Sequence, residues 1–307
     1  MSAVEECPAC GGPLGRGPAL DGGRALLVCA RCGHGVLTPS PTEEELDAAY
    51  HRAYGSAGMK FRPLVERAVR LAASREADVL AAFAPAPHRR VLDVGCGRGV
   101  LLGALADRGL SCVGVERSRE AAIGLDPRVQ LVVAPSLEAA GLSPASFGII
   151  TFRHSLEHLR EPRDSLRTAR RLLAPGGALI VEVPNRASVQ ARVLGRHWFH
   201  LDPPRHLHHF TPASLAAMLS SAGFDVAEVA HGAVLQDVMG WLQGALHAAG
   251  RPTMALYDGL HAQERPPVLD LVLGVAIGPA ALAVAAAERL AGGGAVVKVR
   301  AKSTLVK

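Results

Sequence analysis

A glycine-rich turn flanked by acidic residues is the stretch of this 307-residue chain most suggestive of chemistry. The segment VLDVGCGRG places Gly95, Gly97 and Gly99 directly after a short apolar run. Glycines let the backbone turn tightly and approach a ligand closely, which is typical of nucleotide sites that follow a strand. Asp93 lies two residues before the first glycine, and Glu116 ends the next apolar run. This pattern predicts a site for a nucleotide-like ligand.

The spacing of the glycines separates one nucleotide class from another. The dinucleotide fingerprint G-x-G-x-x-G needs a glycine at position 100, where this chain has valine. An NAD-dependent oxidoreductase is therefore disfavoured. VLDVGCGRG instead resembles motif I of the class I S-adenosylmethionine (SAM) methyltransferases. The resemblance implies that the glycines lie against the methionine moiety of SAM and that Glu116 accepts hydrogen bonds from both ribose hydroxyls.

The resemblance continues along the chain. The stretch FGIITFRHSLEHLREPRDSLRTARRLLAPGGALIVEVPN is similar to the fourth strand, its helix and the fifth strand of that family, most of all in the ubiquinone-biosynthesis-like O-methyltransferases. Gly148 departs from the acidic residue common there, which predicts a looser start of the fourth strand. The predicted cofactor-binding residues are Asp93, Gly95, Cys96, Gly97, Gly99, Glu116, Arg117, Ser136, Leu137 and Arg153. The adenine is expected near Ser136 and Leu137.

A first group of histidines and acids lies in HSLEHL. Glu157 and His158 follow His154 by three and four residues, which predicts one helical face at the carboxyl end of the fourth strand, where the methyl acceptor should bind. In the ubiquinone-type enzymes a similar set can hold a divalent cation, so the resemblance implies a second cation at these three residues. Without metal, His154 or His158 could serve as a general base, because imidazole has a pKa near 6.5.

A second histidine-rich stretch, RHWFHLDPPRHLHHFTPASL, follows the fifth predicted strand. Asp202-Pro203-Pro204 predicts an extended loop, and Thr211-Pro212 predicts the start of a helix. The loop should face the acceptor, so His206 joins the predicted catalytic set of His154, Glu157, His158 and His206. Local packing or capping is the alternative for each of these histidines.

Four cysteines form two C-x2-C pairs separated by eighteen residues: Cys7, Cys10, Cys29 and Cys32. Each pair lets one tight turn present two sulfurs to one ion, which is typical of a four-cysteine zinc ribbon. Two disulfides, or iron in place of zinc, are the alternatives. Four thiolates leave no open coordination position, so the expected role is stability or docking. Cys96 and Cys112 are expected to be unreactive.

The elements that must position these residues follow from the apolar pattern. Strands are predicted at 90–94, 111–115, 129–133, 147–152 and 178–183, with helices between them, and the pair 225–232 and 295–302 completes the sheet. This predicts an α/β fold with a doubly wound, seven-stranded class I methyltransferase sheet whose last strand is antiparallel. Thr42 and Glu45 resemble a capping box at a helix start, and a second helix is predicted over 63–83.

The predicted organisation has five parts. They are a zinc ribbon at 1–38, a helical linker or lid at 39–88, a SAM-binding core at 89–232, a helical insertion at 233–294, and the final strand at 295–307. Within the insertion, helices are predicted near 235–249, 252–262 and 267–290. The last contains seventeen residues without a charge, 271–287, so a buried lid, a homodimer surface, a peripheral membrane contact and a membrane span all stay open.

The charge and composition of the chain limit the classes of partner that it is expected to bind. The net charge of +5 comes from scattered arginines without a long basic run, which argues against nucleic acid. The N-terminus lacks an apolar signal segment, so a cytoplasmic protein is expected. The sequence therefore predicts a SAM-dependent methyltransferase acting on a small-molecule, glycan or lipid-linked acceptor, most readily at oxygen. The alternative is a scaffold protein that keeps the SAM fold without turnover and docks through its ribbon and C-terminal helices.

Overall fold

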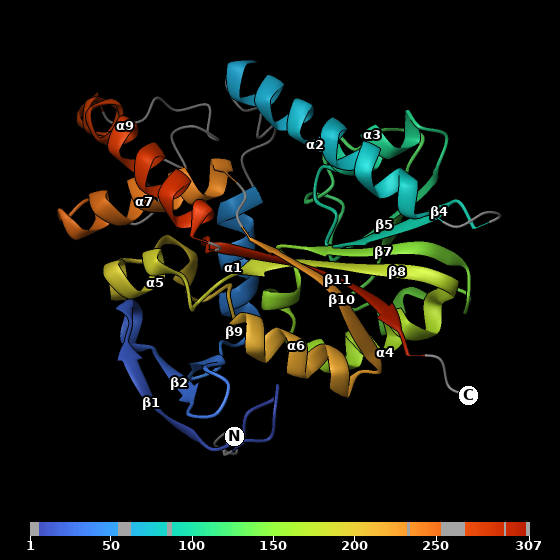
Figure 1. The fold of residues 1–307 in the computed structure, drawn as a ribbon, viewed down its shortest axis with the longest axis horizontal. Helices are drawn as coiled ribbons and strands as arrows, with labels where there is room; N and C mark the ends of the chain where they lie inside the picture. Colours follow the sequence, from blue (N-terminus) through green and yellow to red (C-terminus); the bar gives the residue numbers. More distant parts are fainter. Residues whose placement is uncertain are drawn as a thin grey trace.

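Two β-sheets and the helices around them form the chain (Figure 1). The computed structural model describes residues 6–54, 63–84, 88–231, 234–252, 268–291 and 293–304.

The larger sheet has seven strands in the order β10-β11-β8-β7-β4-β5-β6. Its strands are β4 (Arg90–Val94), β5 (Ser111–Glu116), β6 (Gln130–Val133), β7 (Phe147–Arg153), β8 (Leu173–Pro184), β10 (Phe224–His231) and β11 (Val296–Ser303). The pairs from β8 to β6 are parallel, whereas β11 runs antiparallel to both β8 and β10. The predicted doubly wound sheet with an inserted antiparallel last strand is confirmed.

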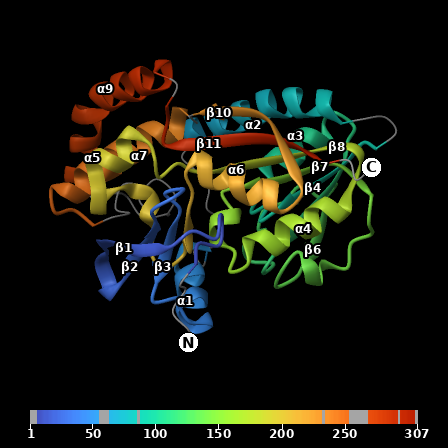
Figure 2. The ribbon, with the colours of Figure 1, turned by 60° about the horizontal axis from the view of Figure 1, so that its bottom comes forward.

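Helices cover both faces of this sheet (Figure 2). On one face α2 (Pro63–Phe83) and α3 (Val100–Ala106) share an apolar cluster with the sheet, and on the other α4 (Pro162–Leu172) and α6 (Pro212–Ser221) share a second cluster. The strand β4 shows why: Val91 belongs to the first cluster and Leu92 to the second, and both are fully buried. A parallel strand buried on both faces has a nearly continuous apolar run, and within Val91–Val94 this run is interrupted by Asp93 alone.

The start of β7 departs from a regular ladder, close to where Gly148 predicted a looser strand. The register with β8 shifts between Phe147 and Ile149, because β8 carries extra residues around Gly176 and Gly177. A Cβ on Gly177 would lie 3.0 Å from the carbonyl oxygen of Gly148 and 2.9 Å from that of Ala174. The bulge therefore depends on a glycine at position 177.

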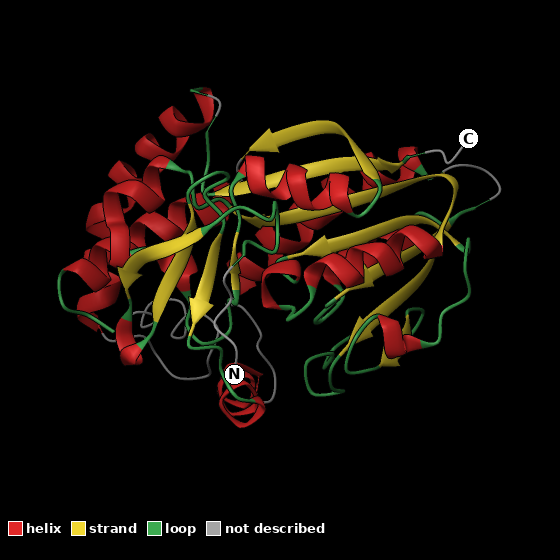
Figure 3. Cartoon of the chain, turned by 90° about the horizontal axis from the view of Figure 1, so that it is seen from below, coloured by secondary structure: helices red, strands yellow, loops and turns green. Residues whose placement is uncertain are grey.

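The smaller sheet lies beside the larger one (Figure 3), has the order β1-β2-β3-β9, and carries Cys29 at the end of β2. Its strands are β1 (Leu14–Ala19), β2 (Ala25–Cys29), β3 (Gly35–Thr38) and β9 (His208–His209). We call residues 6–38 the cysteine ribbon. The fourth strand comes from the loop after β8, about 170 residues away along the chain, so the ribbon's sheet is completed by the part of the chain that carries the second histidine cluster.

The segment between ribbon and core begins with α1 (Glu43–Tyr54). The predicted capping box is present, because the backbone N–H of Thr42 donates to Glu45 and the N–H of Glu45 donates to the Thr42 hydroxyl, at 2.8 and 3.2 Å. The helix predicted over 63–83 is α2, with the same bounds.

The chain between β10 and β11 contributes α7 (Val234–Ala248) and α9 (Val268–Leu290), which pack on each other through Leu242, Leu246 and Ala281. We call these two helices the helical insertion. The short α5 (Val189–Leu194) packs against α7. The helix predicted near 252–262 lies outside the described residues, apart from its first residue.

In the part of the chain that the structure describes, α9 is the one helix long and apolar enough to cross a membrane by length and composition. Only 24% of its most apolar window is buried. The structure therefore does not support the prediction that this segment is a wholly buried lid.

Candidate functional site

The glycine-rich turn after β4 has the backbone that the sequence predicts. Gly95, Gly97 and Gly99 all have positive φ, at 73°, 51° and 63°. A Cβ on Gly95 would lie 2.6 Å from the Cβ of Ser155, and a Cβ on Gly99 would lie 2.1 Å from a methyl of Leu125. Both the dihedral angles and the close neighbours therefore demand glycine at these positions.

A cavity of about 660 Å³ opens beside this turn, at the carboxyl ends of the strands. It is lined by Asp47, Tyr50, His51, Val94, Gly95, Val115, Glu116, Arg117, Ser118, Glu120, Ala121, Ile123, Ala134, Pro135, Ser136, Leu137, His154, Ser155, His158 and Leu159. It is large enough for a nucleoside-sized ligand with room beside it. The cavity joins residues of the glycine-rich half of the sheet to residues of the HSLEHL segment.

Glu116 presents its carboxylate at the end of β5, inside the cavity. One oxygen accepts the backbone N–H of Gly97 at 2.7 Å, and the other accepts its neighbour Arg117 N–H at 3.0 Å. Burial raises the pKa of this carboxyl, and the two backbone hydrogen bonds oppose the rise. The backbone thus fixes the carboxylate in place, with its remaining lone pairs available to a ligand hydroxyl.

Asp93 lies behind the turn and is not among the residues that line the cavity. It is 4% exposed, and the hydroxyl of Thr151 donates to its Oδ1 at 2.6 Å. Burial raises the pKa of this carboxyl to about 6. From this position Asp93 can support the glycine-rich turn from within the sheet, but it does not face the ligand cavity.

The predicted cofactor-binding residues divide into two groups. Those that line the cavity are Gly95, Glu116, Arg117, Ser136 and Leu137, and those that do not are Asp93, Cys96, Gly97, Gly99 and Arg153. Cys96 turns toward β5, where its sulfur would lie 2.4 Å from a Cβ added to Gly114. Arg153 turns toward Glu76 on α2, with which it pairs at 2.9 Å.

The segment predicted as a helical linker or lid contributes a wall of the cavity. Asp47, Tyr50 and His51 of α1 line it. The guanidinium of Arg117 lies over the ring of Tyr50 and pairs with Asp47 at 3.1 Å, so α1 is tied to the end of β5. The amphipathic helix after position 42 was the available signal, but nothing in its residues says which element it covers.

The HSLEHL segment does not form the predicted α-helical face. Leu156–His158 is a single 3-10 turn, and His154 precedes it with a φ of +50°. The imidazole of His154 lies between two carboxylates, 3.5 Å from Glu157 and 3.2 Å from Glu182. Burial alone would lower the pKa of His154, but these two carboxylates raise it to about 9. His154 is therefore protonated near neutral pH and is unsuited to act as a general base.

His158 and His206 lie face to edge, with ring centroids 4.6 Å apart, beside the buried carboxylate of Glu157. Burial lowers the pKa of both histidines to about 4, so both are neutral. Each Nδ1 donates to a backbone carbonyl, that of Arg205 at 2.9 Å and that of His200 at 2.8 Å. This leaves both Nε2 atoms as acceptors.

These three residues could hold a cation. One ligand atom from each of Glu157, His158 and His206 can lie within 4.8 Å of the others, and the carboxylate of Glu157 accepts no hydrogen bond among the described residues. Histidines whose Nδ1–H bonds a backbone carbonyl are typical metal ligands. The structure thus replaces the predicted set of His154, Glu157 and His158 by one in which His206 takes the place of His154.

The loop after β8, which carries His206, has a different backbone conformation from the predicted one. Asp202 adopts a left-handed conformation, with a φ of +37°, instead of the predicted extended one. Its carboxylate lies 3.6 Å from Nε2 of His206 and pairs with Arg205 at 2.7 Å. Thr211 and Pro212 begin α6 as predicted, with the Thr211 hydroxyl accepting the N–H of Ser214.

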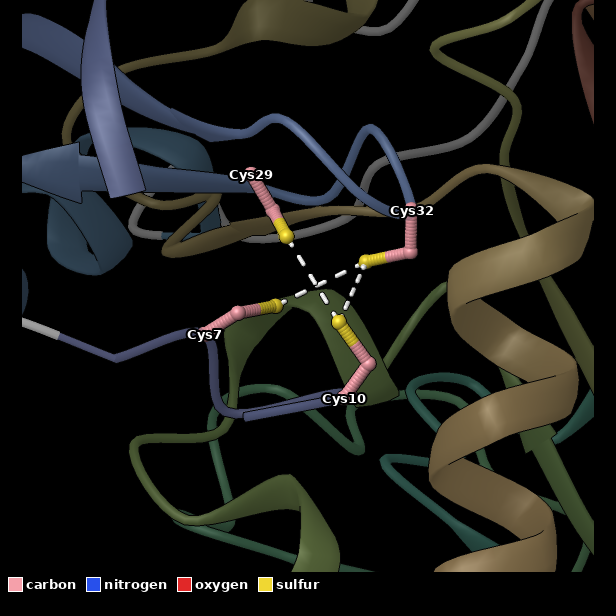
Figure 4. A group of neighbouring side chains, drawn as sticks. All are labelled: Cys7, Cys10, Cys29 and Cys32. Carbon is pink, nitrogen blue, oxygen red and sulfur yellow. Dashed lines mark hydrogen bonds between the residues drawn. The ribbon is translucent and has the colours of Figure 1, made fainter. Parts of the chain in front are cut away.

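The four cysteines of the ribbon converge on one point (Figure 4). Their sulfur–sulfur distances are 3.6 Å for Cys7–Cys32, 3.5 Å for Cys10–Cys29 and 3.3 Å for Cys10–Cys32. These are far longer than a disulfide bond of about 2.05 Å. Zinc–sulfur bonds of about 2.3 Å in a tetrahedron place sulfurs slightly under 4 Å apart, so the donor set fits a zinc ion. Gly11 and Gly33, which follow the pairs, have positive φ.

The chain is similar to known methyltransferases. The methyltransferase domain family matches residues 65–229. The ubiquinone biosynthesis O-methyltransferase of Xanthomonas campestris pv. campestris (strain B100) is 33% identical over 182 residues, which cover 54% of this chain and 71% of that protein. The enzyme of the same name from Xanthomonas axonopodis pv. citri is 34% identical over 157 residues, covering 46% of this chain and 64% of that protein.

Among solved structures, one match comes from the complex between the Haloferax volcanii Trm112 methyltransferase activator and a methyltransferase. It has a TM-score of 0.53 and 17% identity, and it covers 87% of this chain and 99% of that one. At this identity the likeness concerns the fold alone.

Proposed function

This chain belongs to the class I SAM-dependent methyltransferases, and on that premise we propose that it methylates an oxygen atom of a small-molecule or lipid-linked acceptor. The observation that carries the proposal is the continuous cavity that Gly95 and Glu116 line at one end and His158 at the other. Such a cavity can hold a methyl donor and an acceptor in contact. The preference for oxygen is supported by the relatives that carry the name O-methyltransferase.

The donor end of the cavity fits SAM. The space beside Gly95 accepts no Cβ, and the carboxylate of Glu116 is held for two hydroxyls by the N–H groups of Gly97 and Arg117. When bound, SAM supplies a methyl group on a sulfonium centre that an acceptor atom can attack in line. The chain's own contribution is to hold the reactants together in the right orientation, which supplies most of the rate enhancement.

The acceptor end offers two ways to take up the proton of a hydroxyl. His158 is neutral and lines the cavity, so its Nε2 can accept a proton. Alternatively, Glu157, His158 and His206 would hold a divalent cation that favours the ionised form of the acceptor oxygen. The buried carboxylate of Glu157 favours the cation, because it accepts no hydrogen bond among the described residues and the protonated His154 comes no closer than 3.5 Å. His154 stays protonated and positions Glu157 and Glu182.

We also propose a structural zinc ion in the cysteine ribbon, held by Cys7, Cys10, Cys29 and Cys32. The convergence of the four sulfurs supports it. With four thiolate ligands the ion has no free position, so it would stabilise the fold without taking part in methyl transfer.

For a lipid-linked acceptor, α9 offers a means of approach, and we propose that it contacts the membrane surface from a cytoplasmic protein. Val272 and Val275 on its outer side are 57% and 71% exposed. All three acids of the described insertion, Asp237, Asp270 and Glu288, are buried, whereas Arg289 is exposed. An apolar helix face with cationic but no anionic groups complements an anionic bilayer. A homodimer through the same face is the competing outcome, and light scattering after gel filtration tests it.

Calorimetric titration with SAM, with NAD as the control ligand, tests the donor end. We expect micromolar binding of SAM and none of NAD. Glu116→Ala should weaken SAM binding at least tenfold, because charge-assisted hydrogen bonds contribute about 1.5–3 kcal/mol each. Glu44→Ala, an exposed carboxylate of α1 outside the cavity, serves as the matched control. An isotherm of Glu116→Ala that matches the wild type would refute the assignment of this carboxylate.

The acceptor end is tested with Mn²⁺, followed by electron paramagnetic resonance. The wild type should bind one Mn²⁺ beyond any metal in the ribbon, and Glu157→Gln should lose it while binding SAM as before. Glu138→Gln, a carboxylate outside the candidate ligand set, should behave like the wild type. Equal Mn²⁺ affinity in Glu157→Gln and the wild type would leave His158 as the proton acceptor.

A further inference from the structure

Leu207 joins the cysteine ribbon to the acceptor-side histidines by main-chain hydrogen bonds. Its carbonyl accepts the backbone N–H of Leu37 in β3 at 3.0 Å, and its own N–H donates to the carbonyl of Glu157 at 2.9 Å. Leu207 directly follows His206. A displacement of β3 would therefore move both the loop that carries His206 and the turn that carries Glu157 and His158.

The second cysteine knuckle is tied to the same region by side chains. The hydroxyl of Thr211 donates to the carbonyl of Cys32 at 2.7 Å, and Arg186 donates to the carbonyl of Gly33 at 3.0 Å. The sulfur cluster also lies inside the main apolar core, because Cys7 and Cys29 belong to the same buried cluster as Leu156. The ribbon is thus built into the core rather than tethered to it.

His34 makes a contact between two side chains across this seam, by which we mean the contacts of the cysteine ribbon with the loop that carries β9. It is fully buried, and its Nε2 lies 3.1 Å from Nδ1 of His208 in β9. Because Nε2 of His208 points to the carbonyl of Arg160 at 3.4 Å and is its donor, Nδ1 of His208 is the acceptor and His34 the donor. The carbonyl of His34 accepts the N–H of Cys29, so the same residue belongs to the knuckle.

From these contacts we propose that the ribbon positions the acceptor-side group Glu157, His158 and His206. His34 is the positioning residue, and the metal ion proposed at the four cysteines holds His34 in place. The ribbon is then a part of the acceptor site that touches neither donor nor acceptor. The donor-end residue Glu116 ends β5, and among the described residues none of the contacts named above reaches it. Disturbing the seam should therefore loosen the acceptor end and leave SAM binding unchanged.

Hydrogen exchange read by mass spectrometry on the full chain tests this coupling. In His34→Ala we expect exchange at least tenfold faster in peptides covering 154–160 and 205–210. Zinc content and the Kd for SAM should stay within twofold of the wild type. His34→Gln keeps an N–H donor at a similar reach and should restore protection. Leu80→Ala in α2, a buried residue of the other core cluster, controls for a general loss of stability.

Removal of the ribbon metal by a chelator provides a second, independent arm. The same two segments should lose protection, while α3 and β5 keep theirs. Unchanged exchange at 154–160 and 205–210 in both arms would overturn the proposal. Equal loss of protection in α3 and β5 would also overturn it, because the ribbon would then support the whole domain rather than the acceptor end.

Discussion

The cysteine ribbon and the helical insertion both extend the same core, but they are attached to it by different interactions. The ribbon is joined by main-chain hydrogen bonds to β9 and by the donors Thr211 and Arg186 to its knuckle. The insertion is joined by buried acids, because Asp237 accepts the N–H of Ala295 and Glu288 accepts that of Val189. The ribbon therefore shares a sheet and a core with the acceptor side, whereas the insertion keeps one face free.

The difference shows in what each region leaves exposed. The ribbon contributes Cys7 and Cys29 to the largest apolar cluster of the described chain, and both are nearly inaccessible. The insertion packs α7 against α9 through a small separate cluster, and the outer valines of α9 stay exposed. Loss of the ribbon's internal links should thus affect the enzyme's core, while changes on the outside of α9 should affect only what that face meets.

The largest effect is expected for Cys29→Ser. The side chain is 1% exposed within the main core, and its loss removes a ligand from the proposed zinc site. The free energy of unfolding should fall by about 4 kcal/mol or more, the range typical of losing a structural metal. Cys112→Ser, a buried cysteine outside the cluster, should cost distinctly less. Denaturant titration with zinc analysis measures both, and equal losses in the two variants would contradict an integral ribbon.

An intermediate effect, dependent on pH, is expected for Asp237→Asn in α7. Burial raises the pKa of Asp237 to about 6, above the value near 3.9 in an unfolded chain. The folded state therefore binds this proton more tightly, so the group's contribution to stability is greatest below pH 4 and is lost as the pH rises through about 6. The variant should be more stable than the wild type at pH 8 by on the order of 1–3 kcal/mol and equal to it below pH 4.

Denaturant titrations at pH 4 and pH 8 measure the Asp237→Asn effect. Asparagine retains the oxygen that accepts the N–H of Ala295, so the comparison isolates the charge. Asp225→Asn on the exposed part of β10 is the control and should change little at either pH. A destabilised variant at pH 8 would mean that the ionised carboxylate holds the insertion to β11.

The smallest effect on stability is expected on the outer face of α9. Val272→Ser combined with Val275→Ser should change the free energy of unfolding by less than about 0.5 kcal/mol per site, because both side chains are mostly exposed. Sedimentation with vesicles of anionic phospholipid should nonetheless fall several-fold. Val226→Ser with Val229→Ser on β10 offers a matched pair of exposed valines that should leave sedimentation unchanged. The membrane proposal fails if both pairs behave alike.

Much of the fold could be predicted because local signals were strong. The run VLDVGCGRG identified β4 and its turn, and the capping box at Thr42 identified the start of α1. The antiparallel last strand followed from the family resemblance. Pairing of β3 with β9 could not be predicted, because two residues in a loop carry no periodic pattern and the partner lies about 170 residues away.

The sequence predicted which residues line the candidate site better than it predicted how they are arranged. Glu116 and His158 line one cavity as expected. The expected helical face at His154 is absent, because the segment makes one 3-10 turn after a left-handed residue, although spacings of three and four residues suggest a helix. Glu182, one of the two carboxylates that raise the pKa of His154, comes from β8 and has no local signal in HSLEHL.

The pairing of β3 with β9 also has a consequence for synthesis on the ribosome. The three strands of the ribbon are translated first, but the strand that completes their sheet follows about 170 residues later. At roughly 5–20 residues per second, this leaves the edge of β3 unpaired for about 10–30 seconds. During that interval the four cysteines have been synthesised, but the strand β9 that completes their sheet has not. The supply of the proposed zinc ion to the nascent chain, rather than to the finished enzyme, would then decide how many molecules mature with an ordered acceptor end.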